Sequence, residues 1–426
     1  MAPPDSTPFP LVKLHAIADQ RQSWVALDVR VLAGQANATD TLHQLFDGSA
    51  LLTALAPLDC VLHVAAPADL SDALLALLPP HRVVLAFDAA SLADGAAAKR
   101  AAALHEAGYR LLVDIGDPQA AAADAARIGA ADADAAQAGA AGVAAAAQVA
   151  ATPAAVALPL SLRARARDCR HGAPPPNALA TLFGPHLAYH VDSAARFDAC
   201  ALAGFAWFSG DYALRPAATA TSHDGTSRKR LLALLGLLSR DADARELETV
   251  LKQDPALAYQ LLKVVNSAAF ALSMPITGFV HAINVLGRRQ LQRWLQLLLY
   301  ARQQDDGLAH PLLPEAARRA AQMEALCKAA GGDRDAQDLA FMAGVFSLLD
   351  VLLGMPMAEI VGALSIAPAV AEALLARTGA LGRLLGLVDA ATPDAGQLAE
   401  AGIDTALWWR STLDACHWAI QVSRNV

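Results

Sequence analysis

The chain has 426 residues, more than one compact core usually holds, so we expect two domains. Apolar residues make up 55% of the sequence, which excludes a chain that is disordered by composition. The formal net charge of −8 gives no general attraction to nucleic acid or to an anionic membrane, so we predict neither as a partner.

The five cysteines are scattered, odd in number and without CxxC spacing, which is typical of a reduced, cytoplasmic protein. The first residues, MAPPDSTPFP, lack the basic head and apolar run of a signal peptide. Residues 135–162 carry no charge, but they are mostly Ala and Gly and therefore too weakly apolar for a membrane span. We predict a cytoplasmic protein with no membrane span.

Short β-like runs recur in the N-terminal half, with Ala- and Leu-rich helical stretches between them. Such alternation predicts parallel β/α units, and about eight of them suggest a closed barrel of the α/β class. The sixth strand is hard to place, because residues 118–156 are so rich in alanine that helix is favoured. The runs are LVKLHA at 11, WVALDVRV at 24, CVLHVA at 60, RVVLAF at 82, RLLVDI at 110, VALPL at 156, LAYHV at 187 and FAWF at 205.

Four polar residues follow or end these runs, where a parallel barrel places its chemistry. Side chains alternate along a strand, so Asp28 and Arg30 share one face and are predicted to point into the barrel mouth. Asp114 and Asp192 are the other two candidates. Two interpretations stay open, a satisfied ion pair between Asp28 and Arg30 or a ligand site.

Three blocks of this half resemble the EAL domain, the barrel phosphodiesterase fold that handles cyclic di-GMP. They are ALDVR at 26–30, AGYRLLVDIGD at 107–117 and HVDSAARFDACALAGFAWFSGDYALRP at 190–216. The resemblance covers about residues 11–216, and we assign residues 1–216 to a degenerate EAL domain.

The resemblance implies two divalent ions held by Glu, Asn and Asp ligands, which activate water for attack on a phosphodiester. Most of those ligands are missing here. Asp28 replaces the first Glu, Val64 stands at the Asn position and Ala86 at the next Glu. Asp114 is followed by Ile115 instead of a second Asp, and the family's lysine has no counterpart. We therefore predict no catalytic residues, no metal and no cofactor.

Binding of cyclic di-GMP without cleavage is a separate alternative, because a phosphate needs only charge and donors, such as those of Arg30. Asp28, Asp114 and Asp192 would make the mouth acidic, which disfavours a dianionic ligand.

Residues 217–230, AATATSHDGTSRKR, are small, polar and then basic, and predict a linker between domains. Residues 231–426 then read as an all-α domain. We predict three short helices between 254 and 301, a helix over 315–330 with Arg318, Arg319 and Lys328 toward solvent, and a buried helix over 340–353.

This helical half resembles the HDOD family, a metal-free relative of the HD phosphohydrolases found in bacterial signalling proteins. The resemblance spans about 218–426, and an EAL domain followed by an HDOD domain is itself a known pairing. Its blocks are KVVNSAAF at 263–270, PIT at 275–277, INVLGRRQLQRW at 283–294 and FMAGVFSLLDVLLGMPMAEIV at 341–361.

Asn266 and Ser267 form a polar pair within this half. They either hydrogen-bond within the helical core or mark a docking face for another protein. The sequence as a whole predicts a non-enzymatic regulatory or scaffold protein of bacterial signal transduction. Its expected partners are other signalling proteins, with cyclic di-GMP as a candidate ligand. The alternative is a weak metal-dependent cyclic di-GMP phosphodiesterase that uses Asp28, Asp114 and Asp192. The sequence predicts no oligomeric state.

Overall fold

The structure is a computed structural model that divides into two compact units, residues 14–52 with 57–212, and residues 1–13 with 53–56 and 213–426. We describe each unit by itself. The structure describes residues 9–31, 38–47, 50–117, 164–215, 237, 246, 288–300, 311–364, 366–390 and 393–425.

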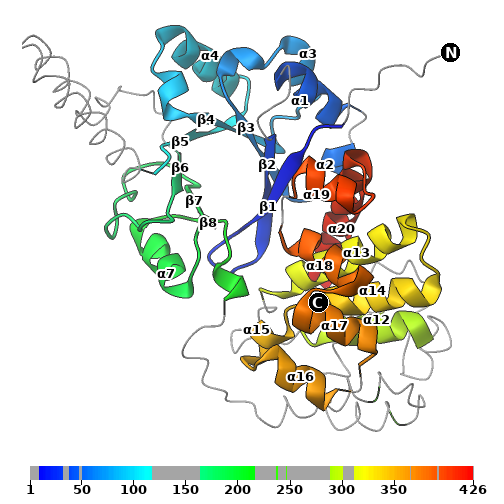
Figure 1. Cartoon of the computed structure of the whole chain (residues 1–426). Helices are drawn as coiled ribbons and strands as arrows, with labels where there is room; N and C mark the ends of the chain where they lie inside the picture. The colour runs from blue at the N-terminus through cyan, green and yellow to red at the C-terminus, as the bar shows by residue number, and fades with distance from the viewer. Residues whose placement is uncertain are drawn as a thin grey trace, which may run out of the picture. The chain divides into compact units, whose positions relative to one another are not determined.

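The first unit contains a closed barrel in which eight strands follow one another in chain order (Figure 1). This confirms the predicted N-terminal barrel. The strands are β1 (Val12–Ala18), β2 (Trp24–Val31), β3 (Asp59–Val64), β4 (Val83–Asp88), β5 (Arg110–Asp114), β6 (Arg165–Asp168), β7 (Leu187–Tyr189) and β8 (Trp207–Phe208).

Consecutive strands from β2 to β8 pair in parallel, whereas β1 closes the barrel by pairing antiparallel with β8 at Ala18 and Phe208. The expectation of parallel units throughout was therefore wrong for β1. A tight turn at 19–23 joins β1 to β2 and leaves no room for the crossover helix that a parallel pair needs. The sixth strand is Arg165–Asp168, while the run at 156–160 lies outside the described residues.

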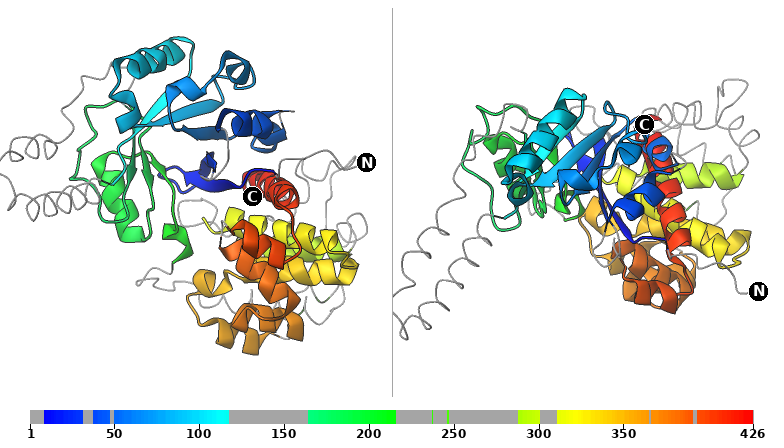
Figure 2. Two further views of the ribbon diagram at one scale, coloured as in Figure 1. Left: turned by 45° about the horizontal axis from the view of Figure 1, so that its top comes forward. Right: turned by 90° about the horizontal axis from the view of Figure 1, so that it is seen from above.

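Helices lie between several of the strands of this unit, and α4 contacts β5 (Figure 2). The N-cap of α4 is Asp94, whose carboxylate accepts from the N–H of Ala97 at 3.2 Å. α7 ends at Ala203 and is capped by Gly204, whose φ of 106° is a left-handed conformation that favours glycine. The helices are α1 (Ala38–Phe46), α2 (Ala50–Ala54), α3 (Asp72–Leu75), α4 (Gly95–Glu106) and α7 (Ala194–Ala203).

The barrel interior is filled by one buried cluster that draws on all eight strands. Its members are Ile17, Ala26, Val61, Val84, Ala86, Leu112, Ala166, Leu187, Tyr189 and Trp207. Strand residues two positions away from a member share its face, so this cluster identifies which side chains point inward along each strand.

The second unit is helical, as predicted for the C-terminal half. Its most extensive helix contacts join α13 to α14 and to α20, and Figure 1 shows α13 and α14 side by side. The described helices are α12 (Arg288–Leu298), α13 (Leu313–Ala329), α14 (Arg334–Phe346), α15 (Leu349–Leu353), α16 (Met357–Ala363), α17 (Pro368–Ala376), α18 (Gly379–Asp389), α19 (Ala395–Glu400) and α20 (Thr405–Asn425).

The contact between α13 and α14 depends on Gly344. A Cβ at this position would lie 2.6 Å from the Cα of Ala320 on α13, closer than real Cβ contacts allow. The two helix backbones therefore approach at a glycine facing an alanine, which places both helices at the centre of the unit.

The expectation that Arg318 and Arg319 face solvent was wrong. Arg319 is only 7% exposed, and both guanidinium groups donate to the carboxylate of Glu315 one turn earlier. Arg319 also donates to Ser347 at 3.2 Å and to Asp389. Burial raises the pKa of Glu315, but Arg318 and Arg319 outweigh it and lower that pKa to about 2. A buried ion network thus joins α13 to α18.

The buried helix predicted over 340–353 is two helices, α14 and α15, which break at Ser347 and Leu348. The hydroxyl of Ser347 donates to the carbonyl of Gly344 at 2.8 Å, a side-chain bond that competes with the helical pattern. α12 confirms the third of the helices predicted between 254 and 301, and the first two lie outside the described residues. In the described ranges, no helix has the length and hydropathy needed to cross a bilayer.

Candidate functional site

The C-terminal ends of β2, β3, β5 and β7 bring five polar side chains together at the barrel mouth. Asp28 and Arg30 share the face of Ala26 on β2, and His63 shares the face of Val61 on β3. Asp114 ends β5, and Tyr189 ends β7. We call Asp28, Arg30, His63, Asp114 and Tyr189 the mouth cluster.

Asp28 is the centre of the mouth cluster and is only 2% exposed. Arg30 Nε donates to Asp28 Oδ2 at 2.8 Å. His63 Nε2 lies 2.8 Å from Asp28 Oδ1, in ion-pair contact but outside hydrogen-bond geometry. Burial raises the pKa of Asp28, but the charges of His63 and Arg30, with the hydrogen bond from Arg30, outweigh it and lower that pKa to about 2. Asp28 is therefore a carboxylate at neutral pH.

Asp114 is the second buried carboxyl group of the cluster. Its Oδ1 accepts from the Tyr189 hydroxyl and from the backbone N–H of Gly116, both at 2.9 Å. Its Oδ2 lies 3.9 Å from His63 Nδ1. Burial raises the pKa of Asp114, although these donors and the charge of Arg30 act against the rise. The two acids thus have pKa values shifted in opposite directions.

The guanidinium of Arg30 also lies over the ring of Tyr189, with 4.7 Å between its Cζ and the ring centroid. The Arg30 side chain is 28% exposed, but its Nη2 is buried and makes no hydrogen bond. Burial together with Asp114 raises the pKa of Tyr189, so the ring stays a neutral phenol. A partly exposed arginine stacked on an aromatic ring is a group that can contact a planar or anionic ligand.

Of the four predicted mouth residues, Asp28, Arg30 and Asp114 lie in the cluster, but Asp192 does not. Asp192 forms an ion pair with Arg196 four residues later, at 3.1 Å. The prediction that Asp192 adds to an acidic mouth is not supported by the described contacts. The two carboxyl groups of the cluster face Arg30 and His63 instead.

Sequence reasoning missed His63 and Tyr189. It assigned Val64 to the mouth position of the third strand, but Val64 alternates with the inward-facing Val61 and His63. The sequence did contain a signal for His63. It is a polar residue within the apolar run of β3, two residues after the inward-facing Val61. Asn266 and Ser267, the predicted interaction pair, lie outside the described residues.

A second polar group borders the mouth on β6 and β7. Asp168 accepts from Arg170 Nε at 2.9 Å and contacts His190 Nδ1 at 2.9 Å. Arg165 and Arg167 belong to the strand β6, which ends in this paired aspartate.

The mouth cluster does not fit a divalent ion. Such an ion needs several free oxygen donors, whereas the carboxylate oxygens of Asp28 and Asp114 already face Arg30, His63, Tyr189 and Gly116. Within the described ranges, no three His, Cys, Asp or Glu side chains are arranged to hold a metal. The residues present therefore do not fit the two divalent metal ions that the resemblance to EAL domains implies.

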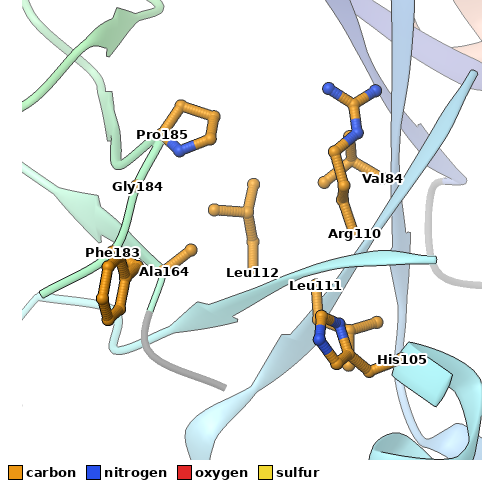
Figure 3. A pocket seen from close by; sticks show the side chains of 9 residues that line it. All are labelled: Val84, His105, Arg110, Leu111, Leu112, Ala164, Phe183, Gly184 and Pro185. Carbon is orange, nitrogen blue, oxygen red and sulfur yellow. The ribbon is translucent and has the colours of Figure 1, made fainter. Parts of the chain in front are cut away.

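A cavity of about 330 Å³ lies at the other end of the strands (Figure 3). Arg110 begins β5, and Pro185 precedes β7, so the cavity opens at the N-terminal ends. Figure 3 shows Phe183 and Pro185 facing Arg110 and Val84 across Leu112. Arg110 is already 2.8 Å from Asp59, and no member of the mouth cluster lines this cavity.

The family comparison matches residues 229–357 to the HDOD domain. A Bacillus subtilis protein named "Uncharacterized protein YuxH" is 27% identical over 205 residues, which are 47% of this chain and 50% of the relative. "Cyclic di-GMP phosphodiesterase CdgJ" of Vibrio cholerae is 26% identical over 249 residues, 56% of each chain. The chain spans about half the length of the curated relatives it matches.

Solved structures show only distant likeness. A putative phosphohydrolase from Shewanella amazonensis has a TM-score of 0.35 at 17% identity, covering 46% of this chain and 93% of that one. The Klebsiella pneumoniae BlrP1 complex with calcium and cyclic di-GMP has a TM-score of 0.32 at 15% identity, covering 49% and 56%. These scores carry no functional argument.

Proposed function

We propose that this protein is a non-enzymatic regulator of bacterial signal transduction in a cyclic di-GMP-related pathway, acting through contacts with other signalling proteins. The HDOD match at 229–357 supports a signalling role. The Vibrio cholerae relative is named a cyclic di-GMP phosphodiesterase, which supports the pathway.

The observation that carries the non-enzymatic part is the contact of Asp28 with Arg30 and His63, each at 2.8 Å. Metal-assisted hydrolysis needs an ion that lowers the pKa of a bound water. The carboxylates that would hold such an ion are neutralised by the protein's own side chains. The mouth therefore lacks the means to activate a water in this way.

The same mouth is the site at which the protein senses cyclic di-GMP. The partly exposed Arg30 side chain brings a positive charge that can attract a phosphate, and its stacking on Tyr189 holds the guanidinium in place. The charge balance also favours an anion more than the sequence predicted, because Asp192 pairs with Arg196 and His63 joins the cluster.

Calorimetric titration of the full chain with cyclic di-GMP tests this sensing role. We expect a saturable heat that Arg30→Ala abolishes. Arg110→Ala is the matched control, since it removes a guanidinium at the opposite end of the barrel. A heat that Arg30→Ala leaves unchanged would place the nucleotide elsewhere, and no heat in the wild type would remove sensing from the proposal.

Protein contacts are tested separately, by cross-linking the full chain in its native host and identifying the captured proteins by mass spectrometry. We expect signalling proteins to be captured at peptides of this chain that the mass spectra locate. Capture that is the same with an unrelated bait of equal size and charge would refute the scaffold role.

The alternative function is a weak phosphodiesterase that uses Asp28, Asp114 and Asp192 with a ligand from a partner. The name of the Vibrio cholerae relative favours it. Incubation with Mn²⁺ and cyclic di-GMP separates the two proposals. Linear dinucleotide that disappears in Asp114→Asn would establish the phosphodiesterase, whereas an unchanged substrate supports the regulator.

A further inference from the structure

The mouth cluster holds two buried carboxyl groups, and positively charged side chains of the protein stand where a bound cation would otherwise balance them. Asp28 and Asp114 are 2% and 6% exposed. Burying a carboxylate without a countercharge is costly, so a fold that keeps two of them at one barrel end must supply positive charge there. That charge comes either from a bound ion or from side chains.

We infer that Arg30 and His63 take the place of a divalent cation at the barrel mouth, and that removing them opens a site for a hard divalent ion such as Mn²⁺. This inference deepens the proposed function and rests on the same mouth. It assigns to Arg30 and His63 the role of excluding the ion, and to Asp28 and Asp114 that of latent metal ligands.

The positions of the two groups carry the inference. Arg30 Nε covers Asp28 Oδ2, and His63 Nε2 covers Asp28 Oδ1, each at 2.8 Å. The His63 ring lies between the acids, because its other nitrogen is 3.9 Å from Asp114 Oδ2. One imidazole thus spans the two carboxylates, as a bridging ion would.

The contact between Asp28 and His63 is an ion-pair contact and not a hydrogen bond. The Asp28 Oδ1 and His63 Nε2 atoms are buried and lie close together, yet neither makes a hydrogen bond. A hydrogen-bonded structural pair would normally be aligned.

The choice of ion follows from the donors. The atoms that would be freed are carboxylate oxygens, which suit Mg²⁺ and Mn²⁺ better than soft ions. The substitution His63→Asn adds a further oxygen donor at the same position. Arg30→Ala removes the guanidinium that covers Asp28 Oδ2. The double variant therefore combines an open space with an added ligand.

The experiment is a calorimetric titration with Mn²⁺ alone, without nucleotide, on the full chain. We expect the wild type to show at most weak binding, and the double variant Arg30→Ala/His63→Asn to bind one Mn²⁺ at least tenfold more tightly. Adding Asp28→Asn to the double variant should abolish the gain. Arg110→Ala is the control, since it frees a single carboxylate, Asp59, and should gain nothing.

Circular dichroism verifies that each variant is folded. If the double variant fails to fold, Arg30→Gln keeps a hydrogen-bond donor without the charge and should still bind Mn²⁺ more tightly than the wild type. A folded variant that gains no Mn²⁺ affinity overturns the inference. So does a wild type that binds Mn²⁺ as tightly as the variant, through Asp28. Neither result bears on the nucleotide titration, so failure of the inference and of the proposed sensing role are distinguishable.

Discussion

Tyr189 donates its phenolic hydrogen bond to Asp114 at 2.9 Å and thereby links β7 to β5 across the barrel mouth. Both side chains are buried, so the acceptor has no water to replace a lost donor. We expect Tyr189→Phe to lower the free energy of unfolding by about 1 to 3 kcal/mol. Tyr212→Phe is the control, because the described residues give that hydroxyl no hydrogen bond. Urea unfolding of the full chain, followed by hydrogen exchange in β5 and β7, measures both, and equal effects would contradict the prediction.

The pKa of Asp28 predicts a loss of barrel stability in acid. The group titrates at about 2 in the fold, below its ordinary value, so its contribution is present above the unfolded pKa and is lost as the pH falls from about 4 toward 2. The shift corresponds to about 2 kcal/mol. Asp114 acts in the opposite direction, because its raised pKa favours the fold at low pH.

Urea midpoints measured at several pH values, with hydrogen exchange in β2 as the local probe, check this dependence. Asp28→Asn should make the urea midpoint less dependent on pH and should lower the stability at neutral pH. Asp72→Asn should leave it unchanged, since the Asp72 side chain is 94% exposed in its pair with Arg100. A wild-type profile as flat as that of Asp28→Asn would disprove the assignment.

The buried network around Glu315 predicts a large effect in the helical unit. Arg319→Met leaves the Glu315 and Asp389 carboxylates without one of their donors, and we expect a loss of about 3 to 5 kcal/mol. Arg383→Met is the control, because Arg383 is exposed on α18. Thermal and urea unfolding of the full chain, with hydrogen exchange in α13, compare the two, and a loss below 1 kcal/mol for Arg319→Met would mean that the network carries little stability.

Gly344 predicts a steric effect at the crossing of α13 and α14. Gly344→Ala would press a methyl group against the Ala320 backbone, and we expect about 1 to 3 kcal/mol of destabilisation. Gly386→Ala on α18 meets nothing within 4 Å and should instead stabilise its helix by up to about 1 kcal/mol. Opposite shifts in the urea midpoint are the expected result, and shifts of the same sign would contradict it.

Much of the barrel could be predicted from sequence because a parallel strand buried on both faces is a continuous apolar run, as in β4 with VVLAF. β6 could not, because RARD alternates two arginines with an inward Ala166 and a paired Asp168. The pairing of Asp28 with Arg30 followed from the period of two, since both residues are on one strand.

The features that the sequence did not predict depend on contacts between residues far apart in the chain. Arg319 is buried because Asp389, 70 residues later, accepts its hydrogen bond. Nothing local in a helix rich in charge distinguishes such an arginine from a solvated one. His63 was missed for the opposite reason, because its neighbours are apolar and the run reads as plain core until the inward positions are known.

The pairing of β3 beside β2 sets Val61 opposite Asp28, and His63 follows two residues later on the same side. A sheet has no intermediate register, so deleting a single residue just before β3 would turn Leu62 and Val64 inward and His63 out. The mouth would then lose a nitrogen base and keep both acids. The net charge of the mouth therefore depends on the number of residues that precede Asp59 as well as on which charged residues the strands carry.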